Sequence, residues 1–257
     1  MSRDFIVTKE HRRFIEFATA VRKEHTIGIC HGDAGIGKTQ SARRYAHWDT
    51  VEPFITEWGP RTEDDAKLYA TANRCRTVFY TPEVLPRPKI LMHEIAHLQT
   101  KLGICIDEHQ RNIGKVTGAH SGHTNKWVEL LIIDEADRLK TTGLEQVRDF
   151  YDRHRVGVIL IGMPGIEKRL ARYPQLYSRI GFAHEYRALR SDELTAVVAQ
   201  RLPDPDPDDS GLAHTAALAA IVRATNGNFR LADRLVTQIN RILDINNQTH
   251  LIPEAVD

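Results

Sequence analysis

Residues 32–39 read Gly-Asp-Ala-Gly-Ile-Gly-Lys-Thr and match every fixed position of the pattern G-x-x-x-x-G-K-[ST]. Its glycines let backbone N–H groups converge on phosphate oxygens without interference from a Cβ atom. The apolar run Thr26–Cys30 predicts a buried strand before the loop, and residues 39–46 predict a helix after it. The N-terminus of such a helix directs its positive dipole end at an anion. The stretch therefore predicts a phosphate-binding loop between a strand and a helix.

This loop supplies most of the expected nucleotide site. We expect Lys38 to reach the β- and γ-phosphates of ATP, and the Thr39 hydroxyl to ligate Mg²⁺. The expected cofactors are thus ATP and Mg²⁺. The predicted nucleotide-binding residues are Gly32, Asp33, Ala34, Gly35, Ile36, Gly37, Lys38, Thr39, Gln40 and Asp134.

A second motif carries two carboxylates at the end of an apolar run, Val128-Glu-Leu-Leu-Ile-Ile-Asp-Glu135. In an open parallel sheet, ligands bind beyond the carboxyl ends of the strands. We expect Asp134 to hold Mg²⁺ through water, and Glu135 to orient and deprotonate the attacking water. An Asp-Glu pair suits hydrolysis better than transfer to a second substrate.

The rest of the chain alternates strand and helix patterns as far as residue 190, which predicts a parallel sheet covered on both faces. The fold class is thus α/β, a P-loop αβα core. Further strands are expected at 77–81, 130–134, 156–162 and 182–189, helices at 9–24, 89–102 and 143–154, and a loop at 111–126.

After residue 190 the pattern becomes helical. Ser191 is a candidate helix cap, and further helices are expected at about 210–224 and 228–245. The segment Pro203-Asp-Pro-Asp-Pro-Asp-Asp209 predicts a stiff acidic connector. We therefore predict two domains, a nucleotide-binding core at 1–190 and a small helical lid at 191–257.

Two arginines, Arg179 and Arg230, follow the phosphate loop and the Asp-Glu motif along the chain, and each is a candidate for contact with the nucleotide. Arg179, in Tyr177-Ser-Arg179, precedes the last predicted strand and could reach a γ-phosphate on a neighbouring subunit. Arg230, in Gly227-Asn-Phe-Arg230, opens the last helix and could close the lid over the nucleotide. Taken alone, each arginine is more typical of a surface ion pair, and it is their order after the two motifs that favours the functional roles.

The full order of these motifs resembles the AAA+ ATPases. The matching residues are the Gly32–Thr39 loop, Leu130–Glu135, the strand Val156–Gly162, Ser178-Arg179 and Gly227–Arg230, and they span about residues 9–245. The resemblance implies an arginine finger at Arg179 and a sensor 2 at Arg230. The family usually has a polar sensor 1 at the end of the fourth strand, whereas this chain reads Leu160-Ile-Gly-Met-Pro164. Hydrolysis that is slow, or stimulated by DNA or a partner, is therefore expected.

Within the family, the chain resembles the transposition regulators of the TnsC/TniB/MuB group. The matching stretches are Ser41–Tyr45, Val78–Val84, Leu131–Leu139, Leu160–Leu170 and Tyr177–Ile180. The resemblance implies a homo-oligomer, a ring or helical filament, that forms on duplex DNA with ATP. It also implies two kinds of partner, a DDE transposase that is recruited and a targeting protein. Another AAA+ DNA remodeller, such as an initiator or helicase loader, and a nucleotide-gated scaffold with little turnover remain as alternatives.

Charge is distributed unevenly along the chain. The net charge is +1, but residues 191–257 carry 5 Lys and Arg against 10 Asp and Glu. A polyanion surface is therefore expected before residue 190. Within 86–126 scattered basic residues suit contacts to DNA phosphates, although a solvated loop would look the same. The DNA-binding candidates are Arg87, Lys89, Lys101, Arg111, Lys115 and Lys126.

A competing motif is His93-Glu-Ile-Ala-His97, which matches the H-E-x-x-H pattern of zinc proteases. No third ligand has the expected spacing, and His109, His120 and His123 are the only guesses. We interpret the motif as part of a helix surface.

Composition limits the remaining classes. The chain has 257 residues, of which 41% are hydrophobic and 27% charged, as in ordinary globular proteins. No apolar run approaches the length of a membrane span, and no signal core follows Met1. Three cysteines without paired spacing predict reduced thiols and a cytoplasmic location.

Overall fold

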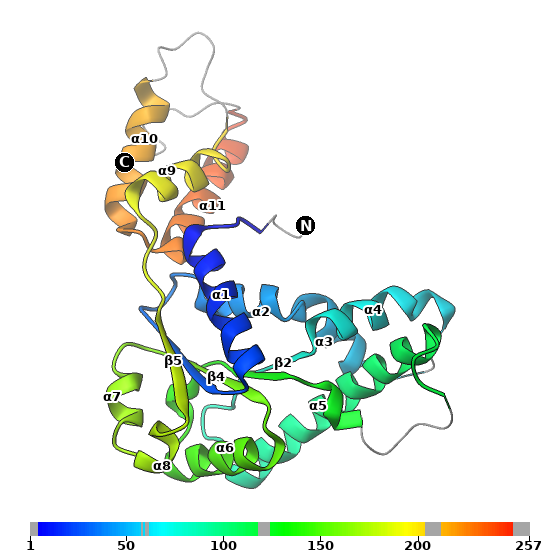
Figure 1. Cartoon of the computed structure of the whole chain (residues 1–257). Coiled ribbons are helices and arrows are strands. Elements are labelled where there is room, and N and C mark those ends of the chain that lie inside the picture. Colours follow the sequence, from blue (N-terminus) through cyan, green and yellow to red (C-terminus); the bar gives the residue numbers. More distant parts are fainter. Residues whose placement is uncertain (1–4, 58, 60–61, 118–123, 204–211, 249–257) are drawn as a thin grey trace. The chain divides into compact units, whose positions relative to one another are not determined.

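The computed structural model describes residues 5–57, 59, 62–117, 124–203 and 212–248. Its contacts divide the chain into two compact units, drawn in Figure 1. The sheet unit comprises residues 13–32 and 38–185, and the helical unit comprises 1–12, 33–37 and 186–257. The division into domains 1–190 and 191–257 stays a prediction.

In the described part of the chain, five parallel strands form one sheet in the order β2-β3-β4-β1-β5. The predicted parallel α/β core is therefore confirmed. β4 lies between β1, which leads into the phosphate loop, and β3, which is followed by Asp134. The strands are β1 (Ile27–His31), β2 (Thr77–Tyr80), β3 (Leu130–Ile133), β4 (Gly157–Gly162) and β5 (Ile180–Glu185).

Helices cover both faces of this sheet, with α1 and α2 on one side and α6 and α8 on the other in Figure 1. Every residue of β2, β3 and β4 is buried, as expected for a parallel sheet packed on two faces. The helices that precede β5 are α1 (Lys9–Glu24), α2 (Lys38–Tyr45), α3 (Trp48–Thr56), α4 (Ala66–Cys75), α5 (Pro88–Asn112), α6 (Thr141–His154), α7 (Ile166–Leu170) and α8 (Pro174–Tyr177). The described residues also contain three 3₁₀ turns, η1 (Glu63–Asp65), η2 (Thr124–Trp127) and η3 (Ala136–Arg138).

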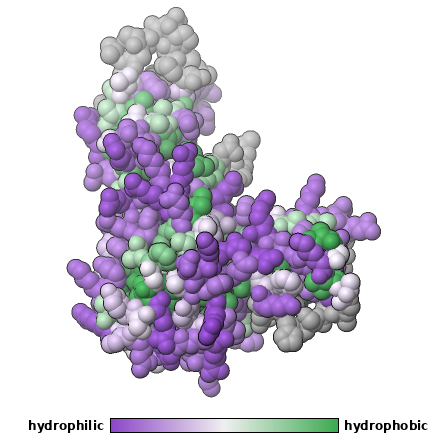
Figure 2. Space-filling view, viewed as in Figure 1, coloured by the Kyte–Doolittle hydropathy of each residue, from purple (hydrophilic) through white to green (hydrophobic). Residues whose placement is uncertain are grey.

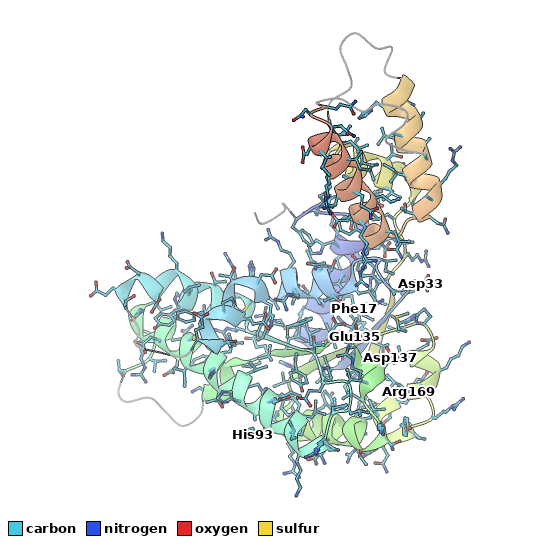
Figure 3. All side chains as sticks on the ribbon, turned by 180° about the vertical axis from the view of Figure 1, so that it is seen from behind. Phe17, Asp33, His93, Glu135, Asp137 and Arg169 are labelled. Atoms are coloured by element: carbon cyan, nitrogen blue, oxygen red, sulfur yellow. The ribbon has the colours of Figure 1, made fainter. Side chains whose placement is uncertain are left out.

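The helix α1 packs directly on the backbone of β1. A Cβ atom at Gly28 would lie 2.8 Å from Phe17 Cζ and 2.5 Å from Val21 Cγ2, so only glycine allows this approach. Phe17, labelled in Figure 3, also stacks on His184 of β5 at 5.4 Å between ring centroids. The strand that carries the phosphate loop is thereby fixed from the side of α1.

The helical unit contains α9 (Ser191–Ala199), α10 (Leu212–Thr225) and α11 (Phe229–Ile245). These helices share a core of buried aliphatic side chains, which includes Leu194, Ile221 and Val236. Asn228 caps α11, because its side chain accepts a hydrogen bond from the backbone N–H of Leu231 at 3.2 Å.

The helix expected at 89–102 is present as part of α5, but its expected end and the expected start of the next loop were wrong. The helix expected at 89–102 runs from Pro88 to Asn112, so the start of the expected 111–126 loop is helical. The reason is a buried polar cluster: Asp107, 1% exposed, accepts hydrogen bonds from Arg111 and from Trp127 Nε1. Because polar residues such as Asp107 occupy buried positions there, the last turns lack the apolar periodicity that predicts a helix. Residues 118–123 of the expected loop lie outside the described residues.

Other boundaries also differ from expectation. The last strand ends at Glu185 rather than 189, because Tyr186 begins the helical unit and Leu189 is buried in that unit's core. Ser191 does not cap α9, since Arg190 occupies the cap position and Ser191 is the first helical residue. The helices α3, α4, α7 and α8 were not expected at all. The acidic connector at 203–209 falls outside the described residues after Pro203.

The surface seen in Figure 2 is largely hydrophilic, in keeping with the charged content of the chain. None of the helices in the described part of the chain is long and apolar enough to cross a membrane. All three cysteines, Cys30, Cys75 and Cys105, are buried, and none is joined in a disulfide bond.

Candidate nucleotide site

The phosphate loop joins β1 to α2, as the sequence predicts. Gly35 and Gly37 adopt φ angles of +80° and +111°, a left-handed backbone that favours glycine. The Lys38 side chain is 9% exposed, and its Nζ donates to the carbonyl oxygen of Gly32 at 2.5 Å. The ammonium group therefore lies back over the first residue of the loop.

The centre of the loop, residues 33–37, groups with the helical unit and contacts the start of α11. Asn228 Nδ2 donates to the Ala34 carbonyl at 2.9 Å, and the Arg230 backbone N–H donates to the Gly35 carbonyl at 2.9 Å. A Cβ atom at Gly35 would lie 2.5 Å from Asn228 Oδ1. Arg230 therefore contacts the loop through its backbone. Asn228 contacts it through its side chain, which no sequence motif predicts.

The two expected Mg²⁺ ligands come from different elements and meet. Thr39 Oγ1 of α2 donates to Asp134 Oδ2, beyond β3, at 2.7 Å. The other oxygen of this carboxylate accepts the backbone N–H of Glu135 at 2.9 Å. A hydroxyl beside a carboxylate is the hard oxygen donor set that Mg²⁺ prefers, so these residues fit the ion.

Burial raises the pKa of Asp134 above its usual value of 3.8, and the hydrogen bonds from Thr39 and Glu135 only partly oppose this. The side chain is 5% exposed. The folded state thus binds a proton more tightly than the unfolded chain, and stability falls as pH rises through the interval between the two pKa values.

We expect Asp134→Asn to stabilise the nucleotide-free protein at neutral pH, because the amide removes a buried charge and can still bond Thr39 and Glu135. Urea unfolding of both proteins across the pH range will show the gap in unfolding free energy opening as pH rises. Mg²⁺-dependent nucleotide binding should be lost in the same variant. A gap that stays constant with pH, or that widens toward acid, would contradict this interpretation.

Glu135 follows Asp134 with its side chain exposed to solvent and with φ at +49°, unusual for a residue with a Cβ atom. It precedes η3, which connects the strand end to α6. An exposed carboxylate beside the expected Mg²⁺ ligands can accept a proton from water.

Arg179 lies in the turn before β5, where its guanidinium is engaged within its own chain. Nε and one terminal nitrogen donate to the two carboxylate oxygens of Asp152, at 2.6 and 2.8 Å. The remaining terminal nitrogen bonds the Gln175 carbonyl and Ser178 Oγ. The hydrogen bonds that Arg179 donates to Asp152 are the largest cause of the lowered pKa of that carboxyl group. Action on a neighbouring subunit stays a prediction.

The six DNA-binding candidates do not gather in one place. Arg87 and Lys89 lie exposed at the start of α5, and Arg111 lies at its end, about 36 Å away along a helix rising 1.5 Å per residue. Arg111 is ion-paired with Asp107 at 3.1 Å. Lys115 is exposed, Lys101 is partly buried, and Lys126 Nζ lies 4.9 Å from the centre of the Trp127 ring. Their contact with DNA stays a prediction.

The His93–His97 motif lies on α5, with both imidazoles exposed and stacked at 6.4 Å. Glu94 accepts a hydrogen bond from Tyr80 Oη at 2.5 Å, which ties the helix to the end of β2. Within the described residues no group of three His, Cys, Asp or Glu side chains could hold a metal ion. His120 and His123 lie outside those residues.

A family model described as an AAA domain matches residues 21–170, which include the phosphate loop, Asp134 and Glu135. The chain belongs to the AAA domain family. It is thus an AAA+ ATPase, and ATP is its nucleotide. A protein named "Potential ATP-binding protein" from Staphylococcus aureus is 40% identical over 268 residues, covering 100% of this chain and 95% of its own.

More distant similarities involve DNA-associated proteins. The "ATP-dependent target DNA activator B" of Escherichia phage Mu is 22% identical over 213 residues, covering 80% of this AAA+ chain and 59% of its own length. The RuvB Holliday junction branch migration motor of Thermotoga maritima shares the fold, with TM-score 0.55, 17% identity, and coverage of 98% and 68%. The ORC1 protein of Aeropyrum pernix, solved in complex with DNA, gives TM-score 0.56, 16% identity, and coverage of 99% and 65%. The chain thus spans less than two thirds of the phage and ORC1 proteins.

Proposed function

We propose that this AAA+ protein is an ATP-dependent regulator of DNA transposition. In this proposal it assembles as a homo-oligomer on duplex DNA when ATP is bound, marks that DNA as a target, and recruits or activates a DDE transposase. The observation that carries the proposal is that 80% of this chain aligns with a protein named as a target DNA activator. The Thr39–Asp134 contact supports the dependence on ATP.

Each nucleotide-site residue has a role in this proposal. Lys38 and the backbone N–H groups of the Gly32–Gly37 loop bind the phosphates, and Gln40 lies in the first turn of the helix behind them. Thr39 and Asp134 would hold Mg²⁺, which neutralises charge on the phosphate oxygens when bound. Arg230 acts as sensor 2.

Hydrolysis is a transfer of the γ-phosphoryl group to water. Glu135 orients the water and takes its proton as the new P–O bond forms and the bond to the ADP oxygen breaks. Arg179 of a neighbouring subunit stabilises the charge that develops on the γ-phosphate oxygens. Because that arginine is bonded to Asp152 in the single chain, assembly would exchange one anionic partner for another.

DNA binding is proposed to be non-sequence-specific and to use phosphate contacts. Arg87, Lys89, Lys115 and Lys126 are the most suitable candidates, because their side chains are exposed. A targeting protein is a further proposed partner of the assembly. The proposed location is the cytoplasm.

A nucleotide-gated scaffold with little turnover is a second candidate, favoured by the apolar end of β4. Ile161 is buried there, Gly162 has no side chain, and Met163 is apolar and 41% exposed. Another type of DNA remodeller would use the same nucleotide site, and stimulation by a purified transposase separates it from the transposition regulator.

Electron microscopy tests the proposal. The full chain is mixed with random-sequence duplex DNA and either a slowly hydrolysed ATP analogue or ADP. Regular rings or filaments along the DNA, formed with the analogue only, are the expected result. Particles that remain monomeric with both nucleotides would remove the basis for both the DNA assembly and the trans role of Arg179.

A further inference from the structure

The turn that follows Asp134, residues 135–139, is held by side chains outside the nucleotide site. It begins at Glu135 in the left-handed backbone region, with φ +49°. A residue with a Cβ atom keeps such a conformation only when its surroundings enforce it. The turn's own bonds, Arg138 N–H to Glu135 O at 2.9 Å and Leu139 N–H to Ala136 O at 3.1 Å, close it locally.

Arg169 of α7 binds the backbone of this turn. Its two terminal nitrogens donate to the carbonyl oxygens of Asp137 at 2.9 Å, Leu139 at 2.6 Å and Ala136 at 3.4 Å. In the part of the chain that the structure describes, no carboxylate pairs with this guanidinium. A planar fork of donors that serves three carbonyls of one turn fixes the path of its backbone.

Asp137 ties the same turn to the end of β4. Its Oδ2 accepts the backbone N–H of Met163 at 2.7 Å. A Cβ atom at Gly162 would lie 2.6 Å from that oxygen, so the carboxylate occupies the space that a side chain on the strand would need. Figure 3 shows Glu135, Asp137 and Arg169 grouped at this end of the sheet. β4, which lies between β1 and β3 in the sheet, is therefore bonded to the turn through the backbone N–H of Met163 at its end. It carries no polar side chain at that end.

We infer that Arg169 and Asp137 are positioning residues for Glu135. They do not touch the reacting atoms, but they hold the turn so that the Glu135 carboxylate projects at the angle that water activation requires. This inference rests on the proposed function, in which Glu135 is the base. Misplacing a base by about 1 Å can cost about a hundredfold in rate while leaving substrate binding intact.

The test compares conservative and disruptive variants of both residues in the full chain with duplex DNA present. Arg169→Lys keeps the charge but loses the fork, so kcat should fall by about 10- to 100-fold while the Kd for a fluorescent ATP analogue changes by less than about twofold. Asp137→Ala should behave in the same way. Asp137→Asn keeps an oxygen that can accept the Met163 N–H, so its kcat should recover to within about threefold of the wild type. Arg172→Lys, at an exposed arginine three residues further on, is the matched control.

A double variant distinguishes positioning from a general loss of structure. If Arg169 acts through Glu135, Arg169→Lys will add nothing to the residual rate of Glu135→Gln. The inference would be overturned if Arg169→Lys lowered kcat by the same factor in the wild-type protein and in Glu135→Gln. It would also be overturned if Arg169→Lys hydrolysed ATP at the wild-type rate while Glu135→Gln was inactive. Wild-type turnover in Glu135→Gln alone would instead overturn the proposed base, and the inference with it.

Discussion

Glu135→Gln is expected to lower the rate of ATP hydrolysis by about 10²- to 10⁴-fold, the range that a positioned general base contributes. The amide has the shape of the carboxylate but cannot take a proton from water. Nucleotide binding should be unchanged, because the phosphate and Mg²⁺ contacts fall to Lys38, Thr39 and Asp134. The variant should therefore remain assembled on DNA after ATP is added.

Phosphate release, binding of a fluorescent ATP analogue and electron microscopy together measure this result. Glu16→Gln, at an exposed position of α1, controls for the change in charge. Normal turnover in Glu135→Gln would rule out Glu135 as the base. Loss of nucleotide binding in that variant would show that its effect is not confined to the chemical step.

The second large effect is expected for Lys38→Ala. Removing a charge-assisted contact to phosphate costs about 3 kcal/mol, which corresponds to a Kd higher by about a hundredfold, and hydrolysis should drop to background. Because Lys38 is largely buried and bonds Gly32 within the loop, the variant also loses one loop contact. Equilibrium titration with a fluorescent nucleotide and steady-state phosphate release measure the two effects.

Lys23→Ala, at an exposed position of α1, is the control for lost charge. Wild-type hydrolysis that disappears in Lys38→Ala rejects the scaffold with negligible turnover. If the wild type itself shows no hydrolysis above background, with DNA and partner present, the scaffold is favoured instead. Tight nucleotide binding by Lys38→Ala would contradict the role given to the loop.

The core of the fold could be predicted because its decisive residues are close in sequence. The Gly32–Thr39 loop and the run ending in Asp134-Glu135 each combine an apolar strand with the residues that follow it. The rule that parallel strands present their carboxyl ends at one edge then brings the two together. The contact between Thr39 and Asp134, which are 95 residues apart in the sequence, is the result of this arrangement of strands.

What sequence reasoning missed depends on contacts between distant residues. Nothing in Arg169 or its neighbours predicts that its guanidinium will bond the carbonyls of residues 136, 137 and 139. The last turns of α5 were not predicted, because a buried carboxylate, Asp107, occupies a position where the helical pattern requires an apolar residue. Charge counting also could not tell that Arg111 is occupied by that carboxylate.

Because all three cysteines are buried, the folded chain should react only slowly with thiol reagents. Burial raises the pKa of the Cys75 thiol, so the reactive thiolate is scarce as well as inaccessible. A maleimide or disulfide reagent would then react only as fast as the surrounding segments open, so its rate reports local unfolding. The same property lets a single cysteine placed on the surface carry a fluorophore, without first removing the native ones.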